Sequence, residues 1–91
     1  KKEQLIEILQ LQLTKLKERF KNLGKELMIE DSVLPYLAEL GYDPRFGARP
    51  LKRVIQRELM DELAMQMLAV PEAQTWRVNY QKSKIEISYE R

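Results

Sequence analysis

Residues 41–56 read GYDPRFGARPLKRVIQ, a stretch in which loop-forming residues give way to a helical pattern. The first part predicts a loop, because Asp43-Pro44 and Gly47 are residue types that favour turns. Two aromatic residues, Tyr42 and Phe46, lie within this loop. We expect their rings to anchor the loop in the core, since aromatic side chains bury a large apolar area.

The second part predicts a helix that begins at Pro50, because proline loses no hydrogen bond at the first helical position. Apolar residues then recur at helical spacing: Leu51, Val54, Ile55 and Leu59. The apolar residues between Leu63 and Leu68 point away from this face at about 100° per residue, so one straight helix cannot bury both sets. We therefore expect a break or bend with Asp61 as a local cap, and an end at Pro71.

Basic residues gather around the start of this helix: Arg45, Arg49, Lys52, Arg53 and Arg57. A helix N-terminus carries about half a positive elementary charge, so each cation there is unfavourable by roughly 0.3–1 kcal/mol. Free N–H groups and Arg49 at the same place are typical of a phosphate site. Two alternatives remain open: Arg49 braces the loop through backbone carbonyls and Asp43, and Arg53 and Arg57 belong to a solvated, partly ion-paired face.

The segment from about Glu3 to Leu23 predicts a long helix with one apolar stripe: Leu5, Leu9, Leu13, Leu16, Phe20 and Leu23. Gly24 is a suitable stop. Ile8 and Leu11 lie roughly 60–120° off this stripe. Either the buried stripe is wide, or these two residues belong to a second contact surface.

Shorter patterns complete the fold. Residues 25–30 alternate in polarity and predict a strand, and Ser32 is expected to cap a short helix that Gly41 ends. Two alternating runs, 76–80 and 85–89, predict a hairpin around Lys82-Ser83 whose turn type stays open. The fold class is therefore α+β, with three to four helices packed on a small three-stranded sheet.

The composition excludes several kinds of chemistry. The chain has 91 residues, a formal net charge of +2, and neither cysteine nor histidine. This rules out disulfides, thiolate nucleophiles and imidazole bases, and the length allows one domain. Glu58, Asp61 and Glu62 most simply form a solvated helix face. We expect the isolated chain to catalyse no reaction, and no apolar run approaches the roughly 18 residues of a membrane helix.

Residues 41–56 closely resemble the sensor-2 region of Clp-type AAA+ ATPases, above all the C-terminal small subdomain of the second ATPase module in the ClpB group. The predicted order of elements agrees over most of the chain, although the hairpin lacks the glycine-rich or acidic connection common in the family. The resemblance implies that residues 1–91 are the small, or lid, subdomain of a larger ATPase. The large subdomain, with its Walker motifs, would lie upstream of Lys1.

The resemblance also implies roles for individual residues. Arg49 would be the sensor-2 arginine, which reaches the γ-phosphate of ATP, with Mg-ATP held mainly by the large subdomain. Gly47 and Ala48 would keep the backbone slim where the nucleotide approaches. The remaining motif residues would support the loop and the helix: Tyr42, Asp43, Pro44, Phe46, Pro50, Leu51, Arg53 and Ile55. Ile8 and Leu11 become candidates for contacts with the large subdomain.

The function that the resemblance implies is that of a lid in a hexameric, cytoplasmic, ATP-driven disaggregase acting on unfolded or aggregated protein clients, without nucleic acid or membrane. A second interpretation is the small subdomain of a ClpA- or ClpC-like unfoldase that serves a protease. A third, of a different class, is a nucleic-acid-binding module that uses the basic residues near Pro50. The nearly balanced charge argues against this third interpretation.

Overall fold

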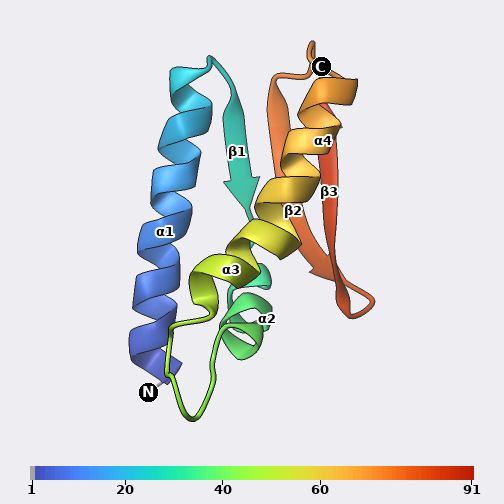
Figure 1. The fold of residues 1–91 in the computed structure, drawn as a ribbon. Coiled ribbons are helices and arrows are strands. Elements are labelled where there is room, and N and C mark those ends of the chain that lie inside the picture. The colour runs from blue at the N-terminus through green and yellow to red at the C-terminus, as the bar shows by residue number, and fades with distance from the viewer. Residues whose placement is uncertain (1) are drawn as a thin grey trace.

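The computed structural model describes residues 2–91, which form helices packed on one face of a small sheet (Figure 1). The elements in chain order are α1 (Lys2–Asn22), β1 (Glu26–Ile29), α2 (Val33–Leu40), α3 (Leu51–Ile55), a π-helical turn η1 (Gln56–Met60), α4 (Asp61–Ala69), β2 (Thr75–Gln81) and β3 (Lys84–Glu90). Because α3, η1 and α4 follow one another without a gap, they form a single helical rod. The predicted α+β class with a three-stranded sheet is confirmed.

The sheet has the strand order β1-β2-β3, with β1 parallel to β2 and β2 antiparallel to β3. Leu27, Trp76 and Val78 are buried on its helix-covered face. The hairpin turn contains Lys82 and Ser83, both with positive φ, at 53° and 65°. Positive φ at both central residues is typical of a type I′ turn, whose twist matches that of the flanking strands.

The stripe of α1 forms much of the core, as predicted: Leu5, Leu9, Leu13, Leu16 and Phe20 are all buried. Leu23 was expected in the same stripe, but it lies beyond the end of the helix and is 64% exposed. The predicted stop at Gly24 is confirmed by its φ of +76°. The N–H of Lys25 donates to Phe20 O at 2.9 Å, the bond that closes a Schellman cap.

The expected cap at Asp61 is wrong, but the expected interruption of the regular helix is present as the π-helical turn η1 directly before Asp61. Asp61 has helical backbone angles, and its N–H donates to Gln56 O, five residues back, in the π-helical turn. This wide turn rotates the apolar positions within and after it, so Leu59 and Leu63 are buried together with the start of α3. Leu68 is 85% exposed, so the second apolar set is only partly buried.

Gly41 ends α2, as predicted, although the reason is close packing. A Cβ on this residue would lie 2.5 Å from Leu51 Cδ1 and 3.0 Å from Leu51 Cα, at the first residue of α3. The missing side chain therefore lets α2 and α3 approach and fixes where α3 begins. The expected cap at the other end of α2 is wrong, because the Ser32 side chain makes no capping hydrogen bond.

Candidate functional site

The loop that precedes α3 is closed by its own backbone. Asp43 N–H donates to Gly47 O at 2.9 Å, and Gly47 N–H donates to Asp43 O at 2.6 Å. The Asp43 carboxylate also accepts from Arg45 N–H at 2.7 Å, which braces the turn at Pro44. Gly47 has a φ of +63°, a region that residues with a Cβ seldom occupy. The conformation is therefore set within the loop, without help from buried aromatic rings.

Tyr42 and Phe46 are not core anchors, contrary to the sequence-based expectation. Tyr42 is 38% exposed and Phe46 is 50% exposed. The Phe46 ring instead contacts two guanidinium groups. Arg45 Cζ lies 5.3 Å and Arg49 Cζ 5.2 Å from the ring centroid, within the range of cation–π attraction.

Arg49 is exposed at the start of α3. The Asp43 carboxylate lies 3.7 Å from Arg45 Nε, so the only acidic residue nearby is directed to another arginine. Within residues 2–91, no carboxylate lies within ion-pair distance of the Arg49 guanidinium. In the same part of the chain, the Arg49 side chain donates no hydrogen bond to a backbone carbonyl. The alternative in which Arg49 braces the loop through backbone carbonyls and Asp43 is therefore wrong.

An open cavity of about 340 Å³ adjoins this guanidinium and is lined by Asp43, Phe46, Arg49, Pro50 and Arg53. Two guanidinium groups against one carboxylate favour an anion in this cavity. Beneath it, Leu51 and Ile55 are 2% and 5% exposed, so the first turn of α3 is held firmly against the core. Ala48 is half-buried and packs against the same core.

Of the three acidic residues expected on a solvated face of the rod, Asp61 and Glu62 are exposed and only Glu58 differs. Glu58 is half-buried and accepts hydrogen bonds from Tyr36 Oη at 3.1 Å and Arg57 Nε at 3.3 Å. Asp61 accepts from Gln56 Nε2 at 2.7 Å, so it does not pair with Arg57. Burial and the bond to Glu58 raise the pKa of Tyr36. No sequence signal pointed to Tyr36, because its partner is 22 residues away.

Ile8 and Leu11 are 43% and 57% exposed. The wide-stripe alternative is therefore wrong, and both residues are available for a contact outside residues 2–91. Within those residues, no group of His, Cys, Asp or Glu side chains could hold a metal ion. No helix of that part of the chain is both long and apolar enough to cross a membrane.

Comparison with known proteins agrees with the family resemblance of the sequence. A family model described as the C-terminal, D2-small domain of ClpB protein matches residues 1–78. The chain belongs to this ClpB family. The ClpB 2 chaperone of Nostoc sp. is 51% identical over 67 residues, which is 74% of this chain and 8% of that protein.

The likeness extends to relatives that cover more of the chain. ClpB of Rickettsia prowazekii is 42% identical over 84 residues, 90% of this chain and 10% of the relative. ClpB 1 of Parasynechococcus marenigrum is 42% identical over 89 residues, 96% of this chain and 10% of the relative. The chain is thus a small subdomain of ClpB type and spans 8–10% of the length of these relatives.

Proposed function

We propose that this chain is the lid of a cytoplasmic, ATP-driven disaggregase of ClpB type, and that Arg49 contacts the γ-phosphate of ATP. Mg-ATP is held mainly by the large subdomain of the parent protein. The observation that supports this role is the placement of Arg49, whose exposed guanidinium lines an open cavity without a carboxylate partner within residues 2–91. A charge-assisted hydrogen bond of this kind contributes about 1.5–3 kcal/mol.

The same geometry links hydrolysis to movement of the lid. Loss of the γ-phosphate removes the anionic partner of Arg49, and the buried Leu51 and Ile55 transmit this change from α3 to the core. The lid then rotates as a rigid body. Ile8 and Leu11 contact the large subdomain of the same chain or of a neighbouring subunit, which supports a hexameric ring that threads unfolded or aggregated clients.

The decisive experiment replaces Arg49 by alanine in the full-length ATPase. We expect the ATP affinity or kcat/KM for ATP to fall by about 10–150-fold, the factor that corresponds to 1.5–3 kcal/mol. Arg45→Ala is the matched control, because Arg45 stacks on the same ring but is ion-paired with Asp43. It should change both quantities less than threefold. Circular dichroism should show that both variants are folded.

Normal turnover together with normal ATP affinity in Arg49→Ala would contradict the proposed phosphate contact. A protease-linked unfoldase of ClpA or ClpC type is less well supported, because the matching family is that of ClpB. A nucleic-acid-binding module is also disfavoured, since Arg45 and Arg57 are paired with Asp43 and Glu58. Duplex DNA binding that falls steeply with added salt would be required to revive it.

A further inference from the structure

A groove runs between α1 and the rod formed by α3, η1 and α4, on a part of the surface distinct from the Arg49 cavity. It consists of two adjoining cavities of about 160 and 180 Å³, which share Leu16, Arg19 and Met60. Neither cavity has a lining residue in common with the cavity at Arg49. The groove is therefore a feature that the proposed phosphate contact does not use.

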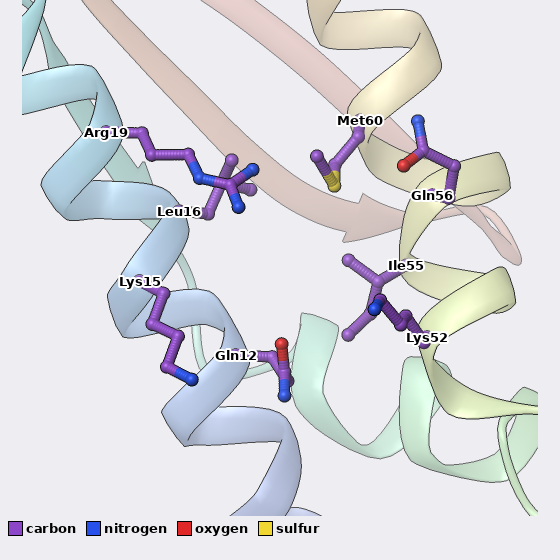
Figure 2. Close-up of a pocket in the computed structure, with 8 residues that line it drawn as sticks. All are labelled: Gln12, Lys15, Leu16, Arg19, Lys52, Ile55, Gln56 and Met60. Carbon is purple, nitrogen blue, oxygen red and sulfur yellow. The ribbon is translucent and has the colours of Figure 1, made fainter. Parts of the chain in front are cut away.

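One half of the groove is basic (Figure 2). Lys15 and Arg19 reach it from α1, and Lys52 reaches it from α3 on the opposite side. No acidic residue lines either cavity, and within residues 2–91 none of these three cations is ion-paired. Like charges that surround one cavity repel one another, so an anionic group placed between them would be stabilised.

The other half is apolar, with Phe20, Leu63 and Met67 among its lining residues. Leu23, at the end of the groove, is 64% exposed. Further along α4, Leu68 is 85% exposed and follows the lining residue Ala64 by one helical turn. Phe20 and Leu63 belong to the core, so the exposed apolar surface here is that of Leu23 and Leu68. Exposed apolar side chains gathered at one place mark an interaction surface, and methionines adapt readily to the shape of a partner.

We propose that this groove binds an amphipathic helix of a partner protein whose apolar anchors are flanked by Asp or Glu. The apolar anchors pack on Leu23 and on the half-buried Met60 and Met67. The carboxylates lie against Lys15, Arg19 and Lys52. Two diverging helices with an apolar floor provide the geometry of helix-in-groove recognition. The basic rim selects an acidic helix over a basic one, because unlike charges steer the encounter and like charges repel.

The test uses the 91-residue chain and a labelled synthetic peptide of about four helical turns, with Leu along one face and Glu beside it. We expect fluorescence anisotropy to show saturable binding. Arg19→Glu should weaken this binding by about tenfold, whereas a peptide with Lys in place of Glu should not bind. The matched control is Lys17→Glu, which makes the same charge change on the same helix but lines a different cavity. It should weaken binding less than twofold.

The apolar half is tested with Leu23→Gln, since an exposed residue can be changed without harm to the core. We expect about fivefold weaker binding of the acidic peptide, against less than twofold for Leu40→Gln, which is 40% exposed and lies outside the groove. Absence of binding, equal binding of the two peptides, or equal losses in a variant and its control would overturn the proposal. Self-association of the chain that Leu23→Gln abolishes would also overturn it, because a second copy would then be the occupant.

Discussion

Gly41 and Gly24 are both helix-ending glycines, but the fold needs them for different physical reasons. At Gly41 an added Cβ would lie 2.5 Å from Leu51 Cδ1, so the requirement is space. At Gly24 no atom lies within 4 Å of the added Cβ, and the requirement is the φ of +76°. The same substitution therefore tests packing at one position and backbone strain at the other.

We predict that Gly41→Ala destabilises the fold by about 1–3 kcal/mol, the usual cost of overpacking, because the Leu51 backbone must shift. Gly24→Ala should cost about 1–2 kcal/mol from its left-handed backbone, and Gly24→Asn less than Gly24→Ala. Urea unfolding followed by circular dichroism measures both. A Gly41→Ala variant as stable as the original chain would contradict the close contact between α2 and α3.

The ionisation of Tyr36 makes the stability of the fold depend on pH. Burial and the bond to Glu58 raise its pKa in the folded state, whereas a tyrosine in the unfolded chain titrates near pH 10. Above about pH 10 the unfolded state therefore loses this proton first, while the folded state retains it. The contribution of Tyr36 to stability is complete below about pH 10 and is lost as the pH rises through the folded-state pKa.

We predict that the free energy of unfolding falls with pH above about pH 10, and that Tyr36→Phe reduces this slope. At neutral pH, Tyr36→Phe should cost about 1 kcal/mol through loss of the bond from Tyr36 Oη to Glu58. Tyr42→Phe is the control and should leave the stability at neutral pH unchanged, since Tyr42 is 38% exposed. If the free energy of unfolding fell equally steeply with pH in Tyr36→Phe and in the original chain, Tyr36 would not be the source of the pH dependence.

At the scale of elements, the π-helical turn decides which apolar residues of the helical rod face the core. In a regular helix, Leu59 and Leu63 would lie roughly 90–130° from the centre of the face formed by Leu51, Val54 and Ile55. The wide turn at 56–60 absorbs one residue, so both faces meet the same core. The rod thus behaves as a regular helix with one inserted residue.

We predict that deletion of Arg57, an exposed residue in this turn, yields a folded variant within about 1 kcal/mol of the original stability. The deletion brings Leu59 and Leu63 within about 30° of the first face in a regular helix. Deletion of Glu62 is the control, because it lies beyond the turn and would rotate Leu63 about 100° out of the core. Thermal unfolding should show loss of several kcal/mol for that control only. Equal losses of stability in the two deletion variants would contradict the interpretation that the π-helical turn absorbs one inserted residue.

At the scale of the whole molecule, the two candidate surfaces flank the first turns of the rod. The Arg49 cavity lies at the start of α3, and the groove with Lys52 and Ile55 lies between the rod and α1. The buried Leu51 and Ile55 join both surfaces to one core. In the proposed lid, this arrangement makes the subdomain move as a unit and does not require catalysis within it.

We predict that the purified 91-residue chain hydrolyses no ATP, because the phosphate contact at Arg49 supplies neither a nucleophile nor a base. Phosphate release is measured with Mg-ATP at millimolar concentration, with the full-length protein as the positive control. Turnover by the isolated chain that persists through repeated purification and disappears in Arg49→Ala would contradict the lid assignment.

The sequence predicted more of the fold than of the site. Leu5, Leu9 and Leu13 repeat at the spacing of one helix face, and Trp76 and Val78 alternate as in a half-buried strand, so local periodicity was enough to place these elements. For the site, it indicated the loop and the start of α3 near Arg49. It did not predict that the Phe46 ring lies outside the core against Arg45 and Arg49.

By itself, then, the sequence determined the α+β class, the apolar stripe of α1 and the family motif at 41–56, because each depends on residues close together in the chain. The tertiary structure alone decided the parallel pairing of β1 with β2, the π-helical form of the interruption in the rod and the groove between α1 and the rod. These features arise from contacts between segments that are distant in the chain. Their free energies depend on how the faces meet, and no local pattern encodes that.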